Sequence, residues 1–195
     1  MRRAGASVSL PAPVSVLVGA LVLAASCGGG GETPGGGQTG SGTVTGTGNL
    51  AGLTTVDVEI VAENGVTTPC CVWLADDPDE RSKGLMGVTD LRRAAGMVFV
   101  FTEDRFGAFY MYDTPMPLSI AFFDADGAFV SAADMTPCTR DDAGDCPRYR
   151  AARPYRTAVE VPVGTLADLG IGPGSRLRVV PGTETAAPCR STDDG

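Results

Sequence analysis

Four carboxylates in the second half of the chain are of the residue type that general acid–base chemistry requires. They are Asp113, Asp124, Asp126 and Glu160. Two such side chains facing one cleft at a defined separation can hydrolyse a glycosidic bond. The stretches Asp113-Thr114-Pro115 and Asp124-Ala125-Asp126-Gly127 also have the composition of turns, in which Asp bonds to its own backbone. The sequence predicts turns here and leaves a hydrolase that uses Asp113 and Asp124 as the alternative.

Several other kinds of chemistry are excluded or disfavoured by composition. The chain has no histidine, which removes Ser-His and Cys-His catalysis and His-ligated zinc. Its formal net charge of −8 argues against a broad nucleic-acid-binding face, because phosphate binding needs clustered Lys and Arg. The Gly172–Ser175 turn lacks the Lys of a phosphate-binding loop. We therefore expect no metal, no cofactor and no nucleic-acid partner.

Two further clusters have both a metal-binding and a structural interpretation. Methionine thioethers can bind Cu(I) in exported proteins, and five methionines fall between residues 86 and 135. Carboxylates can bind Ca²⁺, and Asp141, Asp142 and Asp145 lie close together, without the spacing of a calcium loop. We expect core packing for the methionines and a solvated loop for the aspartates.

The densest basic segment of this acidic chain lies at residues 148–156. Guanidinium groups and aromatic rings suit an anionic or sugar-containing ligand. Local balancing of the preceding aspartates is the alternative. The predicted ligand surface consists of Arg148, Tyr149, Arg150, Arg153, Tyr155 and Arg156.

The N-terminus has the features of a targeting segment. Arg2 and Arg3 precede an apolar run at 14–25, which is too short to span a bilayer and ends just before Cys27. We expect a lipoprotein-type signal peptide (1–26) with Cys27 lipidated; ordinary secretion and an uncleaved anchor are the alternatives. The predicted organisation continues with a flexible Gly/Thr-rich linker (27–52), a β domain (53–182) and a disordered tail (183–195). The protein would then be exported and anchored to a bacterial membrane, on its periplasmic or extracellular face.

The cysteines agree with an oxidising compartment, where pairing is expected. Cys138 and Cys146 bracket a short polar loop and are the predicted disulfide. Cys70 and Cys71 are adjacent, so on a strand their side chains point to opposite faces. One of them could meet Cys189 and the other would be a buried thiol.

Apolar periodicity predicts a mainly β fold. Residues 54–62 alternate apolar and polar positions, Asn64-Gly65 marks a hairpin, and 66–74 returns as a second strand. Asp77 and Pro78 begin a short helix that we expect to end near Leu85. Further strands are expected at 96–101, 107–112, 117–123, 128–135, 157–161 and 176–180, and a helical turn at 165–170. Seven or eight short strands with two short helices indicate a compact β-sandwich, jelly-roll-like fold or barrel.

The order of these motifs is similar to a known family. DDPDERSKGLMG, GMVFVF, FYMYDTPMPLSIAFFDADG, PCTRDDAGDCPRY and VEVPVGTLADLGIGPGSRL follow one another over about residues 54–181. This run resembles the bacterial and archaeal domain of unknown function 192. The resemblance implies a compact, mostly β domain, often exported, with no established activity to carry over. Val88 stands where relatives usually have Arg and Ser119 where they have Asp, so a site built on that pair would be altered here.

The leading hypothesis is a β domain that binds an envelope glycan or protein ligand. The alternatives are the carboxylate-dependent hydrolase, acting on an envelope or glycan substrate, and a structural component of an envelope complex.

Overall fold

The computed structural model describes residues 50–185. The predicted signal peptide, the lipidation site Cys27, most of the linker, and Cys189 lie outside them. Ordered chain extends a few residues beyond both expected domain edges: Leu50 is buried, and Thr185 exchanges backbone hydrogen bonds with Thr55. No helix in the described part of the chain is long and apolar enough to cross a membrane.

Strands dominate residues 50–185, so the predicted mainly β fold is confirmed. The elements are β1 (Thr55–Val61), β2 (Thr67–Ala75), α1 (Pro78–Lys83), β3 (Met97–Arg105), β4 (Ala108–Phe109), β5 (Leu118–Phe123), β6 (Phe129–Met135), the 3-10 helix η1 (Ala143–Asp145), β7 (Tyr149–Arg150), β8 (Tyr155–Pro162) and β9 (Arg176–Val179).

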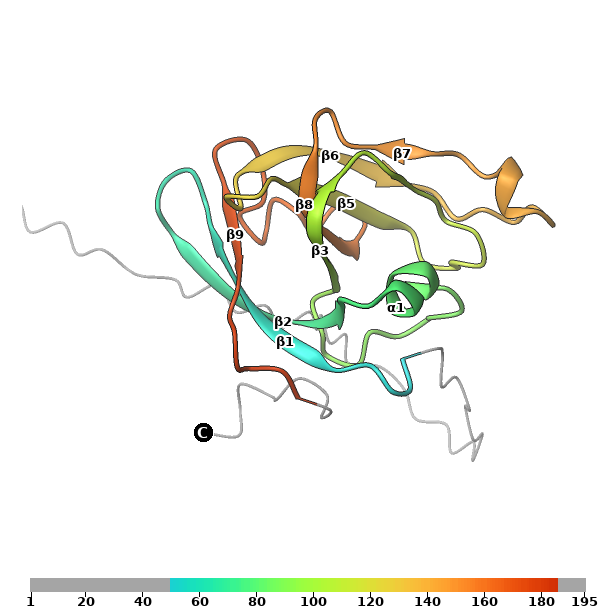
Figure 1. Ribbon diagram of the computed structural model, residues 1–195, viewed down its shortest axis with the longest axis horizontal. Helices are drawn as coiled ribbons and strands as arrows, with labels where there is room; N and C mark the ends of the chain where they lie inside the picture. Colours follow the sequence, from blue (N-terminus) through green and yellow to red (C-terminus); the bar gives the residue numbers. More distant parts are fainter. Residues whose placement is uncertain (1–49, 186–195) are drawn as a thin grey trace, which may run out of the picture.

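Seven strands form one mixed sheet in the order β6-β5-β8-β3-β2-β1-β9, and β4 pairs with β7 in a separate ribbon. Every neighbouring pair in the sheet is antiparallel except β2 and β3, which are parallel. Parallel neighbours need a long crossover connection, and here that connection contains α1. Figure 1 shows α1 and β7 at one side of the molecule, opposite the β1–β2 hairpin and β9.

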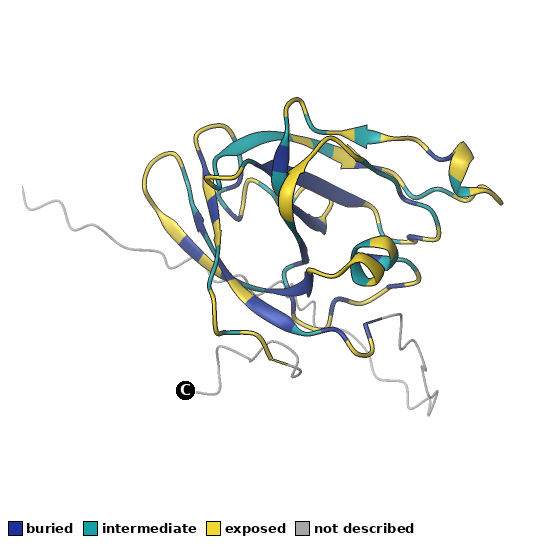
Figure 2. Ribbon diagram, viewed as in Figure 1, coloured by how far each residue is buried: buried dark blue, intermediate teal, exposed yellow. Residues whose placement is uncertain are grey.

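The sheet is buried on both faces, because alternate side chains of its central strands enter two separate apolar clusters. On β5, Ile120 and Phe122 belong to the first cluster, while Ala121 and Phe123 belong to the second. The first cluster also contains Leu85, Val88, Leu91 and Ala94, which follow α1. The second joins residues from β1, β2, β8 and β9 across the curved sheet. In Figure 2 the buried segments follow the central strands, whereas α1 consists of exposed and intermediate residues with none buried.

The two edges of the sheet approach each other without closing into a barrel. Leu177 of β9 donates its backbone N–H to the carbonyl of Gly127 (2.8 Å), and Phe129 donates to Ser175 (3.0 Å). Gly127 has φ +74°, and a Cβ there would lie 2.3 Å from the Leu177 oxygen. Glycine therefore permits both the turn and the close approach. Of the predicted architectures, the protein therefore adopts the one that resembles a β-sandwich.

Local elements follow the prediction closely, with a few differences that depend on tertiary pairing. The segment expected to be a strand at 107–112 pairs over two residues with β7, which the sequence did not predict, and Tyr112 forms an isolated bridge with Cys138. Residues 165–170 form turns that end at Gly170, whose φ is +76°. The methionines expected in the core include Met97, Met111 and Met135, all essentially inaccessible.

Candidate functional site

A cavity of about 460 Å³ lies between α1 and the first apolar cluster. We call it the Glu160 cavity. Small-molecule sites typically have volumes of roughly 300–1,000 Å³, so it is large enough to hold a ligand. Its lining comes from α1 and the turn after it, from β3, from β4 and the segment around it, and from β8; the residues used below are Arg81, Lys83, Phe99, Phe101, Arg105, Phe109, Tyr155 and Glu160.

Glu160 is the most unusual residue of the cavity. It lies in the middle of β8 with Met97 and Ile120 opposite it on the flanking strands, and it is only 5% exposed. Its carboxyl group forms no hydrogen bond or ion pair with any residue between 50 and 185. Every fully enclosed side-chain nitrogen or oxygen in this part of the chain has a hydrogen-bond partner. The Glu160 oxygens have none, so they are not fully enclosed and must reach the cavity.

Burial raises the pKa of the Glu160 carboxyl from 4.5 to about 8. The cause is desolvation, which penalises the charged form when no cation or donor compensates for the lost water. Glu160 is therefore mostly a neutral carboxylic acid at pH 7. In that form it can donate one hydrogen bond and accept others.

Aromatic rings form the walls. Phe99 and Phe109 meet edge-to-face with centroids 5.0 Å apart, and Tyr155 packs on Phe101 in the same way at 5.6 Å. The Tyr155 hydroxyl donates to the carbonyl of Gly107 at 3.4 Å. Burial raises the pKa of Tyr155, against the opposing effect of nearby Arg105. These contacts give the cavity a rigid apolar wall.

Three cations line the cavity. The guanidinium carbons of Arg81 and Arg105 lie 5.0 and 5.4 Å from the centre of the Phe101 ring. Arg81 also donates to the backbone oxygens of Asp76 and Val100, the latter at 2.9 Å. Lys83 is the third.

The short helix α1 is held in place by its ends. Asp77 accepts from the backbone of Glu80 at 2.8 Å, and the Glu80 carboxylate accepts from the backbone of Asp77, a capping box that the sequence partly predicted. The helix ends at Gly84, where a Cβ would lie 3.3 Å from the Phe99 ring. A small residue is therefore needed for α1 to approach the wall of the cavity.

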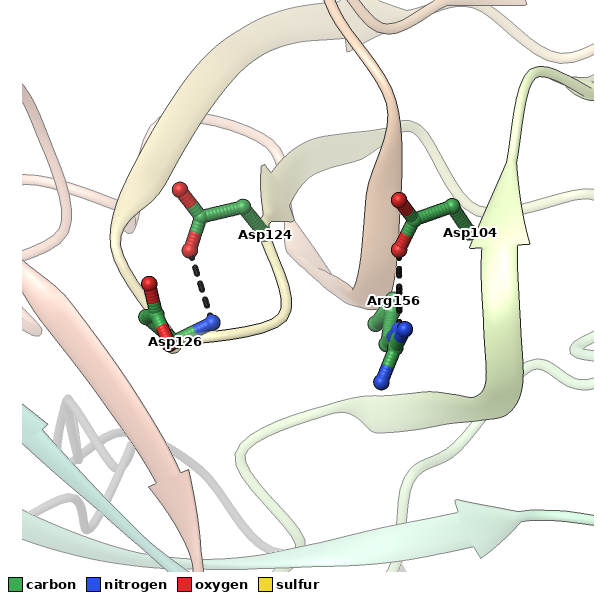
Figure 3. A network of polar contacts seen from close by, with 4 residues as sticks. All are labelled: Asp104, Asp124, Asp126 and Arg156. Carbon is green, nitrogen blue, oxygen red and sulfur yellow. Dashed lines mark hydrogen bonds and ion pairs between the residues drawn. The ribbon is translucent and has the colours of Figure 1, made fainter.

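The two predicted catalytic aspartates do not share a cavity. Asp113 is exposed in a turn with φ 50° and lines a separate hollow of about 340 Å³ beside Cys138. Asp124 accepts a backbone hydrogen bond from Asp126 at 3.0 Å (Figure 3). It accepts another from the backbone of Ala128 at 2.9 Å, and both bonds are the turn role expected from its sequence. Asp124 and Asp126 line a third hollow, together with Arg156 and Thr157 of β8. Whether either residue takes part in catalysis stays a prediction.

The predicted Arg/Tyr ligand surface is divided among different surroundings. Tyr155 is buried in the Glu160 cavity, whereas Arg156 pairs with Asp104 at 2.8 Å beside the third hollow (Figure 3). Arg148 stacks over Tyr110 at 4.4 Å. The hydroxyl of Tyr149 accepts from the backbone of Thr136, Arg150 donates to the carbonyl of Phe106, and Arg153 is exposed. A ligand role for the whole segment stays a prediction.

The disulfide predicted from the sequence is present. Cys138 and Cys146 are bonded, with Cα atoms 5.8 Å apart. Asp142 caps the short helix η1 inside this loop by accepting from Gly144. Cys70 and Cys71 are disulfide-bonded as well, so neither is the buried thiol that we expected. No group of three or more His, Cys, Asp or Glu in residues 50–185 is placed to hold a metal ion.

The two positions that differ from the usual family pattern lie on opposite faces of the sheet. Val88 is buried in the first cluster. Ser119 follows Leu118, which faces that cluster, and therefore points the other way, where its hydroxyl donates to Asp134 at 2.5 Å and accepts from Gly164. An Arg and an Asp at these positions would be separated by the sheet, so the charge pair that we considered would not form.

Sequence reasoning named Glu160 among possible acids and bases but did not single it out, and it missed the cations. Glu160 lies between Val159 and Val161 in an apolar strand segment. A lone acidic residue in such a segment was the sequence feature that could have indicated a buried carboxyl. Arg81, Lys83 and Arg105 carried no such signal, because charged residues on a short helix and at a strand end are usually solvated.

The family pattern of domain of unknown function 192, described as "Uncharacterized ACR", matches residues 59–179, more than half of the chain. A search of curated proteins finds no match. Two solved structures are similar. A "putative transcription regulator" from Sinorhizobium meliloti 1021 has 29% identity and a TM-score of 0.56, over 65% of this chain and 95% of that one. A protein of unknown function from Novosphingobium aromaticivorans DSM 12444 has 30% identity and a TM-score of 0.57, over 67% and 89%. This mainly β chain, with its buried carboxyl facing a cavity, belongs to the domain of unknown function 192 family.

Proposed function

We propose that this protein is an exported, lipid-anchored domain that binds a small molecule in the Glu160 cavity. The observation that carries the proposal is the Glu160 carboxyl, which is buried, has no hydrogen-bond or ion-pair partner among residues 50–185 and reaches the cavity. A buried polar group without a hydrogen bond costs free energy, and a ligand that bonds to it would recover part of that cost. The aromatic walls supply apolar contact for the rest of the ligand.

Binding is favoured over the alternatives by the same residues. Glu160 is the one carboxylate that lines this cavity within residues 50–185, whereas the hydrolase hypothesis needs two facing each other. A role in transcription, as in the description of the Sinorhizobium meliloti protein, would need a basic surface, and this chain has a net charge of −8. A structural role in an envelope complex would not require a ligand-sized cavity with a buried carboxyl.

Export and anchoring are supported by the N-terminal segment and by the disulfides, which persist in oxidising compartments. Metabolic labelling with an alkyne fatty acid, followed by membrane fractionation, tests this part. The wild-type chain should carry the label and sediment with membranes, and Cys27→Ser should do neither. A labelled or fully membrane-bound Cys27→Ser protein would contradict anchoring through this residue.

Ligand binding can be tested with a neutral fluorescent probe, N-phenyl-1-naphthylamine, whose emission rises in apolar sites. The protein should bind it saturably. Ala108→Phe places a ring in the cavity and should abolish binding, and Ser82→Tyr, on α1, should weaken it. Ala132→Phe on the exposed edge strand β6 is the matched control and should bind normally. Thermal unfolding of each variant shows that it is folded. Absence of probe binding to the wild type, or equal binding by Ala108→Phe, would contradict the proposal.

A further inference from the structure

We infer that the ligand of the Glu160 cavity is an amphiphile whose anionic head group lies among Arg81, Lys83 and Arg105. This inference rests on the proposed function and adds the charge of the ligand. It is carried by a different observation, namely that three cations line one cavity and that none of them has an acidic partner among residues 50–185.

Ion pairs elsewhere in residues 50–185 show that partners are available in this acidic protein. Arg156 pairs with Asp104 and Arg178 with Glu59. The chain has 23 acidic residues against 15 basic ones, so an unpaired cation is not explained by a shortage of carboxylates. None of the three cavity cations forms an ion pair within the described residues, a property they share with most basic residues there. What sets these three apart is that they line one cavity.

The arrangement of the two arginines also favours an anion. Both guanidinium groups lie within 5.4 Å of the centre of the same Phe101 ring, one from α1 and one from the end of β3. Both guanidinium groups line one cavity, where like charges repel each other, and an anion bound in the cavity would attract both. Arg81 is already oriented by its bonds to backbone oxygens, so little conformational entropy would be lost when it binds.

The depth of the charged groups orients the ligand. Arg105 is exposed at the end of its strand, whereas Glu160 is buried among apolar side chains. The head group would therefore lie toward the cations, with its apolar body against Phe99 and Phe109 and its inner end near Glu160. A cationic ligand would meet three like charges, and a fully apolar one would leave both ends without partners.

Two probes with the same ring system test the charge directly. N-phenyl-1-naphthylamine is neutral, and 8-anilinonaphthalene-1-sulfonate adds one sulfonate to it. The wild type should bind the sulfonate roughly tenfold to a hundredfold more tightly, the usual effect of one or two charge-assisted hydrogen bonds. This preference should fall as salt is added.

Variants separate the cations from general charge effects. Arg105→Gln should remove most of the preference for the sulfonate, because it removes one cation of the cavity, and the side chain of Arg105 makes a ring contact but no hydrogen bond that supports the fold. Lys83→Gln should reduce the preference too. Arg153→Gln makes the same charge change at an exposed site outside the cavity and should not alter it.

The outcomes distinguish the two proposals. Equal affinity for both probes, or a preference that Arg105→Gln and Lys83→Gln leave intact, overturns the anionic head group while ligand binding stands. Failure of both probes to bind overturns ligand binding itself. Displacement of the sulfonate probe by decanoate or by 4-phenylbutyrate supports the inference and shows whether the natural body is an acyl chain or an aryl group. Displacement by neither overturns the anionic amphiphile.

Discussion

Replacing Glu160 with Gln should change how the stability of this protein depends on pH. The pKa of Glu160 is raised from 4.5 to about 8 in the folded protein. Between these values the folded protein binds more protons than the unfolded chain, so the free energy of unfolding falls as the pH rises. At about 1.36 kcal/mol for each pH unit, the Glu160 contribution lost between pH 4.5 and 9 is on the order of 5 kcal/mol, of which about 3 kcal/mol is lost by pH 7.

The Glu160→Gln variant keeps the shape of the side chain and cannot ionise. Its free energy of unfolding, relative to that of the wild type, should therefore grow by about 3 kcal/mol from pH 4.5 to 7, and by about 5 kcal/mol by pH 9. Guanidinium denaturation at constant ionic strength, with the disulfides intact, measures both proteins. Comparing the two cancels the contributions of the other titrating groups.

Glu103→Gln is the matched control, because Glu103 is an exposed residue of β3 and the chemical change is the same. Its curve should stay parallel to that of the wild type. If the Glu160→Gln and wild-type curves were also parallel from pH 4.5 to 9, Glu160 would be ionised normally. The reasoning from its burial would then be refuted.

Three further substitutions test the packing around the site. A Cβ at Gly96 would lie 1.9 Å from a backbone oxygen of β8, so Gly96→Ala should lower the free energy of unfolding by at least about 3 kcal/mol. Gly172→Ala is the control, because a Cβ there would meet nothing within 4 Å, and it should leave the free energy of unfolding unchanged. Replacing Cys138 and Cys146 by Ser opens a short loop and should lower stability by about 2–3 kcal/mol in thermal unfolding; an unchanged midpoint would contradict this. Asp77→Ala removes the capping box of α1, so it should lower the free energy of unfolding by about 1 kcal/mol in guanidinium denaturation and weaken probe binding. A variant with unchanged stability and unchanged probe affinity would show that the cap does not position the cavity.

The predictions from sequence that were confirmed depend on residues close together in the chain. Asn64 accepts from the backbone of Val66 and Gly65 adopts φ +81° in the β1–β2 turn. Asp77 caps a helix that begins at Pro78. Each of these features is decided by a few neighbouring residues through hydrogen bonds or backbone conformation, so the pattern alone indicates it.

The misses have a common cause in long-range pairing. Alternation of apolar residues does not say which strand will be the neighbour, so the parallel pairing of β2 with β3 and the short β4–β7 ribbon were not foreseen. The carboxylates first considered, Asp113 and Asp124, stand in conspicuous turns, yet the structure places them in different hollows.

The sequence by itself determined the β-rich character of this protein, its helix cap, its hairpin, the Cys138–Cys146 disulfide and its family. Only the tertiary structure decided that α1 and the ends of β3 and β4 lie over the middle of β8. That arrangement puts the Glu160 carboxyl, which has no partner among residues 50–185, in a cavity lined by cations. The physical reason is that the charge state of Glu160 depends on the removal of water from around it, and segments distant in sequence remove that water when the chain folds.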